Sequence, residues 1–368
     1  MGSAHCGLYQ TPFDLPRALP PVCSLDDLIT LPREDRIAYV QRIRVPHAKF
    51  RGVMEECEAI HGLSRKVDRP GCLVIYGHSR SGKTTLCEEF AAARPPIREP
   101  YAKDRVRVLT VTAPPFPTVK GLAEQFLWAL GDPHWYRGTL AQMRRRILKL
   151  LNECEVEIVF LDETQNFVDM TGLVTEFAVT IFLMQLIDEV NVPFVALGLE
   201  RCCNMFRGNE MLRGRFKTHV QLGQYDFDRS EDQREWMRFI EGFAHKLPVK
   251  YMPDFSNAKL ARKMWYASLG LPGHAANIFA EATDIVIRKT DTKDTLTMGV
   301  LSTAFRRTAW QEMTELANPF ESDSDVEKEK LPPIKTDYTA FIEDRTYWKH
   351  VRDARIGLTS ALKKRSAV

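Results

Sequence analysis

The segment Gly77-His78-Ser79-Arg80-Ser81-Gly82-Lys83-Thr84 decides the fold of this chain, and it fits the pattern G-x-x-x-x-G-K-[ST]. In such a loop, consecutive backbone N–H groups surround a phosphate, and the positive end of the following helix adds to the attraction. Lys83 would neutralise charge on the β- and γ-phosphates, and the Thr84 hydroxyl would bind Mg²⁺. The segment, together with Thr85, is therefore predicted to bind ATP or GTP with Mg²⁺.

The residues on both sides of this loop have the pattern that the motif requires. Residues 73–76 (Leu-Val-Ile-Tyr) form a short apolar run, typical of a buried parallel strand. From Thr85 to Ala93 the spacing predicts a helix with Leu86, Phe90 and Ala93 on one face. Strand, loop and helix follow one another in the required order, which favours a true nucleotide site over a chance match.

A second apolar run, residues 156–163 (Val-Glu-Ile-Val-Phe-Leu-Asp-Glu), ends in two carboxylates. This is the Walker B pattern, in which Asp162 would hold Mg²⁺ through water and Glu163 would polarise the attacking water. Strands often end in exposed acids, so the pattern is informative here because it comes about 80 residues after the loop. Gln165 either senses the γ-phosphate beside these acids or caps the turn.

Composition limits the class of protein. The chain has 368 residues, 44% of them hydrophobic and 27% charged, which is ordinary for a globular protein. A net charge of +3 is too small to indicate nucleic-acid binding by itself. No apolar stretch reaches the roughly 20 residues of a membrane span, and residues 1–10 do not form a secretory signal. Eight cysteines without C-x-x-C spacing suggest reduced thiols, so we expect a cytoplasmic protein without a membrane partner.

Alternating strands and helices predict a parallel sheet with helices on both faces. Further strands are expected at 106–111, 194–197 and 218–222, and helices at 50–62, 119–130, 140–151 and 177–190. From Phe227 onward the pattern is helical only, with helices at 230–246, 256–268, 273–289 and 295–314. Ser230 and Gln233 are predicted to form a capping box at the start of the first of these.

The predicted organisation has five parts, and the proline-rich residues 1–35 are expected to be irregular. An acid-rich stretch predicts a flexible linker, and the last residues are basic with four aromatic side chains. The boundaries are an N-terminal arm at 1–40, an α/β nucleotide-binding core at 41–226, a helical lid at 227–317, a linker at 318–337 and a C-terminal tail at 338–368.

The class of nucleotide-binding protein follows from the motifs that are present and absent. A GTPase would carry an N-K-x-D motif, and a small-molecule kinase an acid after its second strand; the chain has neither. Residues 212–216 (Leu-Arg-Gly-Arg-Phe) precede the strand at 218–222, and a helical lid follows. This order fits an AAA+ protein: a P-loop α/β core with a parallel sheet, followed by an all-helical lid subdomain and a C-terminal tail.

With these residues in view, the chain resembles the TniB/TnsC family of AAA+ ATPase regulators of DNA transposition. The resemblance runs from about residue 40 to 315 through GHSRSGKTT, FLDETQNF, VPFVALG, LRGRF and GLPG. It implies an ATP-dependent homo-oligomer, as a ring or helical filament, that assembles on duplex DNA. It also implies that this oligomer receives a target-selection protein of the TniQ type and recruits a transposase, with hydrolysis driving disassembly.

Three positions depart from the family pattern. Arg80 stands where the family often has glycine, and Leu199 stands where it usually has threonine. His274 opens the lid helix where many AAA+ proteins place an arginine that touches the γ-phosphate. These departures suggest ATP hydrolysis that is slow or stimulated by a partner.

Other site residues are predicted from their positions in this pattern. Arg215 is the candidate arginine finger, acting on a neighbouring subunit's nucleotide; Arg213 is the alternative, and an ordinary surface arginine the other reading. Ile43, Val45 and Pro46 precede the first core helix, where AAA+ proteins pack the adenine, although a plain core contact is equally compatible.

DNA contacts are predicted at two places. Thr118 and Lys120 open the helix after the second strand, where a hydroxyl and a lysine suit phosphate binding. Arg144 and Arg145, in a run with Arg146, would add charge, although such runs are more often a solvated helix face. No residue pattern reads bases, so binding should be independent of sequence and strongly dependent on salt.

Three other functions remain open at this point. A helicase-loader-like ATPase that remodels DNA would share the same core. A scaffold gated by ATP would bind the nucleotide with little hydrolysis. A small-molecule phosphotransferase would act as a monomer on a soluble substrate.

Overall fold

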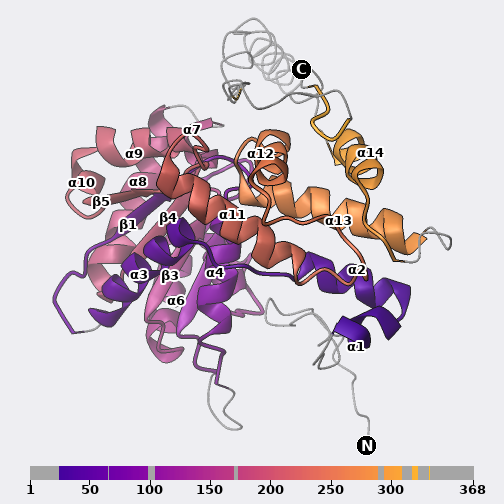
Figure 1. Cartoon of the computed structure of the whole chain (residues 1–368). Helices are drawn as coiled ribbons and strands as arrows, with labels where there is room; N and C mark the ends of the chain where they lie inside the picture. Colours follow the sequence, from indigo (N-terminus) through magenta and orange to yellow (C-terminus); the bar gives the residue numbers. More distant parts are fainter. Residues whose placement is uncertain are drawn as a thin grey trace, which may run out of the picture.

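The computed structural model describes residues 25–64, 66–97, 104–169, 173–288, 294–308, 317–321 and 331. Figure 1 shows an α/β body with a group of helices beside it. The strands are β1 Leu73–Tyr76, β2 Val108–Thr112, β3 Ile158–Asp162, β4 Phe194–Gly198 and β5 Thr218–Gln221. The helices of the body are α3 Ala48–Gly62, α4 Lys83–Ala92, α5 Val119–Ala129, α6 Leu140–Glu153, α7 Asn166–Asp169, α8 Leu173–Val190, η1 Glu200–Cys202, α9 Cys203–Gly208 and α10 Glu210–Arg213.

All five strands are parallel, in the order β2-β3-β4-β1-β5. Strand β4 therefore lies between β1, which leads into the P-loop, and β3, which ends in Asp162. The register pairs Tyr76 with Gly198 and Thr112 with Asp162. Because parallel strands end at the same edge, this register brings the P-loop, the acids after β3 and the end of β4 together.

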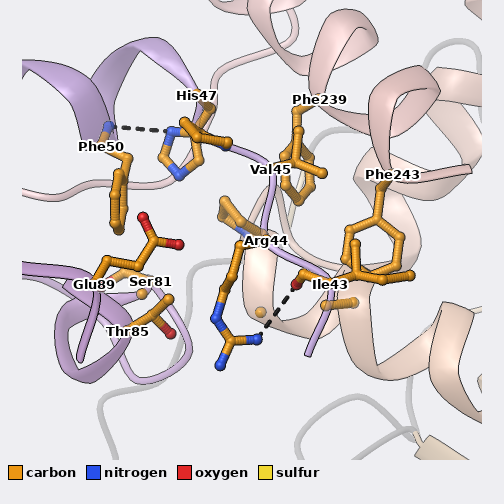
Figure 2. Close-up of a pocket in the computed structure, with 15 residues that line it drawn as sticks. Ile43, Arg44, Val45, His47, Phe50, Ser81, Thr85, Glu89, Phe239 and Phe243 are labelled. Carbon is orange, nitrogen blue, oxygen red and sulfur yellow. Dashed lines mark hydrogen bonds between the residues drawn. The ribbon is translucent and has the colours of Figure 1, made fainter. Parts of the chain in front are cut away.

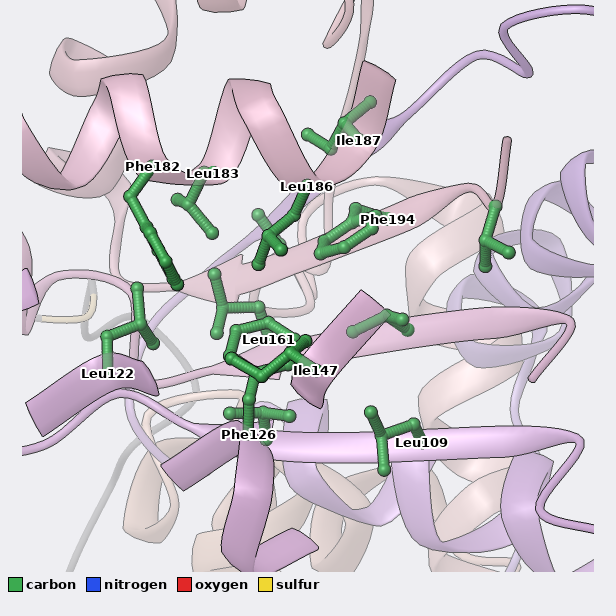
Figure 3. Packing of buried hydrophobic residues seen from close by; sticks show 14 of the residues in the cluster. Leu109, Leu122, Phe126, Ile147, Leu161, Phe182, Leu183, Leu186, Ile187 and Phe194 are labelled. Atoms are coloured by element: carbon green, nitrogen blue, oxygen red, sulfur yellow. The ribbon is translucent and has the colours of Figure 1, made fainter. Parts of the chain in front are cut away.

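Alternating side chains along the strands separate two hydrophobic layers. On β3, Val159 and Leu161 face a cluster with α5, α6 and α8, while Ile158 and Phe160 face α3 and α4. Figure 3 shows Phe182, Leu183 and Leu186 of α8 directed toward the strands, with Phe126 of α5 on the opposite side of the cluster. Both faces of the sheet are therefore covered, which explains the nearly continuous apolar sequence of β3 and β4.

A second core lies among the C-terminal helices α11 Ser230–Ala244, α12 Ala258–Ala267, α13 Pro272–Arg288 and α14 Met298–Thr308. We call these helices the lid. The N-terminal helix α2 Arg33–Gln41 joins this core rather than the sheet (Figure 1), because Val40 and Ile43 are buried in it. Arg36 of α2 also donates to the Pro248 carbonyl at 2.6 Å and to Asp294 at 2.8 Å. Sequence-distant segments thus form one helical unit.

Several local features differ from the sequence predictions. Residues 25–41 contain two helices, α1 Leu25–Thr30 and α2, where an irregular arm was predicted up to residue 35. The predicted capping box is wrong: the N-cap of α11 is Arg229 without a side-chain bond, so Ser230 is already inside the helix. Parts of the predicted linker are packed, since Phe320 is buried against the lid and Leu331 contacts the same cluster.

The remaining predicted parts of the linker (322–330 and 332–337), the tail (338–368) and the arm (1–24) lie outside the described residues. Within the described ranges, six cysteines are buried and free of disulfides, and no helix is long and apolar enough to cross a membrane.

Candidate nucleotide-binding site

The P-loop, residues 77–84, contains three positions where the backbone conformation or the space available restricts the residue type. A Cβ atom at Gly77 would lie 2.2 Å from the Leu222 carbonyl oxygen, so only glycine fits there. Gly82 has φ +102° and is the N-cap of α4, a conformation that favours glycine. Arg80 has φ 64°, which explains why glycine is common at this position and implies local strain of roughly 1–2 kcal/mol.

Lys83 is held inside the loop by two carbonyl oxygens. Its Nζ donates to Gly77 at 2.9 Å and to His78 at 2.7 Å. Burial lowers the pKa of the Lys83 ammonium, while Asp162 and Glu163 oppose that shift. The cation is thus oriented in advance, and phosphate oxygens would strengthen its charged form when they bind.

Thr84 and Asp162 meet at the carboxyl edge of the sheet, where the Thr84 hydroxyl donates to Asp162 Oδ2 at 2.9 Å. The other carboxylate oxygen accepts from the Glu163 backbone N–H at 2.8 Å. Mg²⁺ prefers oxygen ligands and keeps several waters, so a hydroxyl and a carboxylate beside a phosphate cradle fit this ion. These are the residues that would hold it.

Gln165 links the second acid to the end of β4. Its Nε2 donates to Glu163 Oε2, and its Oε1 accepts from the Leu199 backbone N–H at 3.1 Å. Both polar atoms of the Gln165 amide therefore form hydrogen bonds, and the bond from the Leu199 backbone N–H fixes the orientation of the side chain. Glu163 itself has φ 58°, so the acid stands at a sharp turn after β3.

These groups open into one cavity of about 480 Å³, a size typical of small-molecule sites. We call it the phosphate cavity. Its lining includes most of the predicted P-loop residues together with Glu163 and Gln165, and also four residues that the sequence did not suggest. In full, it is lined by Gln41, Arg44, Ser79, Arg80, Gly82, Lys83, Thr84, Thr85, Glu163, Gln165, Leu199, Gly273, Ala276 and Asn277.

His274 is near the P-loop but is not among the residues that line the phosphate cavity. Burial, followed by the charge of Arg80, lowers its pKa to about 4, so it is neutral at pH 7. One turn later, Ala276 and Asn277 of α13 face the cavity instead. At the phosphate cavity the lid therefore presents the amide of Asn277, whereas the sequence suggested the imidazole of His274.

An apolar cleft of about 100 Å³ adjoins the phosphate cavity (Figure 2). We call it the base cleft. It lies between the segment 43–47, the P-loop helix and the lid, and its walls include Ile43, Val45 and Pro46. Phe239 and Phe243 of α11 close the lid side. A planar apolar ring connected to phosphates would fit this arrangement.

The P-loop also contacts the lid directly. The Gly273 N–H donates to the Arg80 carbonyl oxygen at 2.9 Å, and a Cβ at Gly273 would lie 2.5 Å from that oxygen. The first turn of α13 is therefore positioned against the strained residue of the P-loop, and any motion of one affects the other.

The family model of bacterial TniB proteins matches residues 36–225, more than half of the chain. The chain belongs to the TniB family. This confirms the resemblance, and the matched region runs from α2 to the end of the sheet, before the lid. No curated protein sequence matches the chain.

Solved structures similar to this TniB-family chain include three archaeal proteins. The ORC1 protein of Aeropyrum pernix in complex with DNA has a TM-score of 0.55 at 14% identity, covering 74% of this chain and 69% of that one. The ORC2 protein of the same organism (ADPNP-ADP complexes) has a TM-score of 0.54 at 16% identity, covering 74% and 71%. Cdc6p of Pyrobaculum aerophilum has a TM-score of 0.53 at 11% identity, covering 74% and 70%.

At such identities the likeness shows the fold alone. The predicted fold class, a parallel sheet followed by a helical part, is confirmed for this TniB-family chain.

The two candidate arginine fingers have different surroundings. Arg215 forms an ion pair with Asp188 of α8, and its side chain is 20% exposed. Arg213 is exposed, and no ion pair joins it to another of the described residues. The Arg215 carbonyl accepts from the Cys72 backbone N–H, just before β1. Both arginines therefore lie near the amino ends of the strands, whereas the P-loop follows the carboxyl end of β1.

The predicted DNA contacts are only partly available. Thr118 is the N-cap of α5, and its hydroxyl accepts from the Gly121 backbone N–H at 2.9 Å. Lys120 is exposed, and its Nζ lies 3.7 Å from Glu124 Oε1. Arg144 pairs with Glu189, whereas Arg145 is exposed. The structure does not bring these residues into one cluster with the nucleotide site.

Sequence reasoning missed Gln41, Arg44, Ala276 and Asn277 because they belong to no motif. A signal existed for the first two, since Gln41 precedes the predicted adenine residues by two positions and Arg44 lies between Ile43 and Val45. Asn277 follows His274 by three residues and shares its helix face.

Proposed function

We propose that this chain is a Mg²⁺-dependent AAA+ ATPase that regulates DNA transposition. The observation that carries the proposal is the meeting of Lys83, Thr84 and Glu163 at one cavity in a TniB-family chain. Asp162 accepts a hydrogen bond from Thr84 directly beside them. A nucleoside triphosphate fits because a phosphate cavity and an apolar base cleft adjoin each other.

In the proposed reaction, Lys83 and the P-loop N–H groups bind the phosphates, and Thr84 with Asp162 holds Mg²⁺ near them. Glu163 accepts a proton from a water whose oxygen attacks the γ-phosphorus. The bond between the γ-phosphorus and the bridging oxygen breaks, and ADP and phosphate leave. Magnesium supplies neutralisation of the developing phosphate charge.

The finger must act on a neighbouring subunit. Residues Cys72 to Gly77 span roughly 16 Å in extended conformation, so an arginine beside Cys72 lies far from its own P-loop. The ion pair of Arg215 with Asp188 supports Arg213 as the finger, since Arg213 is free to reach a partner. Hydrolysis would then require assembly, in accord with partner-stimulated activity.

Assembly on duplex DNA is the next part of the proposal. The same fold occurs in an ORC1 protein in complex with DNA, so this fold is compatible with DNA as a partner. Family membership supports a ring or filament that links a TniQ-type target-selection protein to a transposase, with hydrolysis driving disassembly. Thr118, Lys120 and Arg145 are the candidate phosphate contacts, because Arg144 already pairs with Glu189.

A second candidate is a DNA-binding scaffold gated by ATP, with little hydrolysis. The bond from Gln165 to Glu163 favours it, because an acid held in this way is not free to activate water. Persistence of the assemblies in ATP would distinguish this scaffold from an active ATPase.

We also propose that the chain divides into a core at 41–226 and a lid at 227–317, with residues 338–368 as a recruitment segment. Cutting the chain after Leu331 would preserve Phe320 and Leu331, which pack on the lid. We expect unchanged melting temperature and DNA assembly, with transposition lost. A large fall in melting temperature would contradict this division.

Electron microscopy with duplex DNA and a non-hydrolysable ATP analogue tests the proposal. We expect rings or filaments on DNA that require the analogue and disperse with ATP. Mixing Lys83→Ala and Arg213→Ala proteins tests the finger, because some interfaces then pair an intact pocket with an intact arginine. Activity should return in that mixture. A chain that remains monomeric on DNA under all these conditions would overturn the proposal.

A further inference from the structure

His47 lies at the wall of the base cleft, between the segment 43–46 and helix α3. It is the N-cap of α3, and its Nδ1 accepts from the Phe50 backbone N–H at 3.3 Å. The same Nδ1 lies 2.7 Å from the hydroxyl of Tyr225, a residue 178 positions later that is completely buried. Two groups from distant parts of the chain therefore converge on one ring nitrogen.

These contacts determine the tautomer. A backbone N–H can only donate, so Nδ1 must present its lone pair, and the Tyr225 hydroxyl donates to it as well. The proton of the neutral ring is then on Nε2. Burial, followed by the charges of Lys49 and Arg51, lowers the pKa of His47 to about 4, so the ring is neutral at pH 7.

Neighbouring rings hold the imidazole in place. Its centroid lies 5.8 Å from that of Phe50, 5.4 Å from that of Tyr225 and 5.7 Å from that of Phe239, all edge-on. The side chain therefore loses little further freedom when a ligand binds.

The Nε2–H has no partner among the residues that the structure describes. Figure 2 shows Nδ1 directed to Phe50 and the opposite nitrogen directed into the base cleft, toward the space bordered by Phe50, Glu89 and Arg44. The walls of the cleft are mainly apolar, with Arg44, Ser81, Thr85 and Glu89 as its other polar lining residues, and the Nε2–H is a donor whose direction is fixed. A donor in such surroundings favours a ligand with an in-plane acceptor, because otherwise its hydrogen bond to water is lost without replacement.

We propose that His47 recognises the base of the bound nucleotide, with its Nε2–H donating to an unprotonated ring nitrogen of adenine. The inference rests on the proposed ATP binding and adds the residue that reads the base. N1, N3 and N7 of adenine each present an in-plane lone pair, and Phe239 and Phe243 on the lid side exclude water from the ring. Tyr225 is a positioning residue, since it acts only through His47.

Deaza analogues of ATP test this pairing. Equilibrium binding of ATP, 1-deaza-ATP, 3-deaza-ATP and 7-deaza-ATP is measured on the full chain and on His47→Phe. In the unmutated protein, one of the three analogues should bind about three- to tenfold more weakly than ATP, the value of one neutral hydrogen bond. In His47→Phe, ATP should weaken by the same factor, and that analogue should bind no worse than ATP.

Controls separate the base from the phosphates and from folding. Inorganic tripolyphosphate has no base, so its competition with a fluorescent nucleotide should be equal in both proteins. His134→Phe, at an exposed loop, should bind every ligand as the unmutated chain does. His47→Asn retains an acceptor for Phe50 N–H but does not extend a donor into the cleft, so it replaces His47→Phe if that variant does not fold.

Equal affinities of ATP for the unmutated chain and both His47 variants would overturn the inference while leaving ATP binding intact. An unmutated chain that binds neither ATP nor tripolyphosphate would overturn the proposed function itself.

Discussion

The phosphate cavity and the base cleft adjoin each other but are built in different ways. Eight of the fourteen residues that line the phosphate cavity come from two short segments, 79–85 and 163–165, and the others come from residues 41–44, Leu199 and the start of α13. The base cleft combines the segment 43–47 with α11 and the start of α13, about 200 residues later. The first is polar and dominated by backbone geometry, whereas the second is apolar and depends on how the lid packs.

This difference has a consequence for function. Residues of the phosphate cavity should control chemistry, whereas residues of the base cleft should control ligand choice and the position of the lid. Gly273, which contacts Arg80, joins the two regions.

The largest effect is expected from Glu163→Gln in the phosphate cavity. Loss of the general base should reduce kcat about 100- to 10,000-fold while ATP affinity stays near that of the unmutated chain. Steady-state hydrolysis and equilibrium binding measure the two quantities. Glu210→Gln, on the surface helix α10, is the matched control, and hydrolysis at the unmutated rate by Glu163→Gln would refute the assignment of the base.

Lys83→Ala should weaken ATP binding by about 100-fold, since it removes charge-assisted bonds to two phosphates. Binding of tripolyphosphate should weaken by the same factor, because Lys83 does not touch the base cleft. Lys149→Ala on α6 is the control, with its side chain 71% exposed. If ATP weakens but tripolyphosphate does not, the division between the two regions fails.

Gly273→Ala tests the joint between the regions. The new Cβ would meet backbone and Cβ atoms of Arg80 at 2.5–3.1 Å, so the lid or the P-loop must move. We expect a loss of about 1–3 kcal/mol in the free energy of unfolding, measured by denaturant titration. A Cβ at Gly299, in α14 of the same lid, would make only an ordinary contact with the Thr297 hydroxyl at 3.8 Å, so Gly299→Ala should be neutral or slightly stabilising. Equal stability of both variants would show that the joint is not tight.

Gln165→Leu tests whether Gln165 replaces the polar side chain that is absent at Leu199, directly after β4. The Gln165 side chain accepts from the Leu199 backbone N–H, so its amide can supply the polar group that the Leu199 side chain lacks. We expect kcat to fall about tenfold with ATP affinity unchanged. Adding Leu199→Thr should restore part of the rate, whereas Leu199→Thr alone should change little. No rescue, with full activity in Gln165→Leu, would assign Gln165 to the turn only.

The smallest effect is a pH dependence that arises in the base cleft. The pKa of His47 falls from an ordinary 6.5 to about 4 in the folded chain, so the unfolded chain binds a proton first as pH decreases. Stability should therefore fall between pH 6.5 and 4, and His47→Asn should remove about 1–2 kcal/mol of that fall. His134→Asn should leave the slope unchanged, and an unchanged slope in His47→Asn would contradict the burial of a neutral ring.

Some parts of the site were predictable from local sequence. Gly77, Gly82 and Lys83 were recognised because a phosphate loop requires particular residues at fixed spacing. Asp162 and Glu163 were recognised because an apolar strand ends in them. The helix at 33–41 was missed, since it packs on α13, which lies far away in the sequence.

The sequence by itself determined the P-loop, the order of strands and helices, and the family, because each depends on short-range patterns of glycine, charge and apolar spacing. Only the tertiary structure decided that β4 lies between β1 and β3, that Gln165 joins Glu163 to Leu199, and that Tyr225 orients His47. It also decided that Asp188 engages Arg215 and leaves Arg213 exposed. These contacts connect residues whose separation in the chain has no period, so only the packing of the sheet and lid can bring them together.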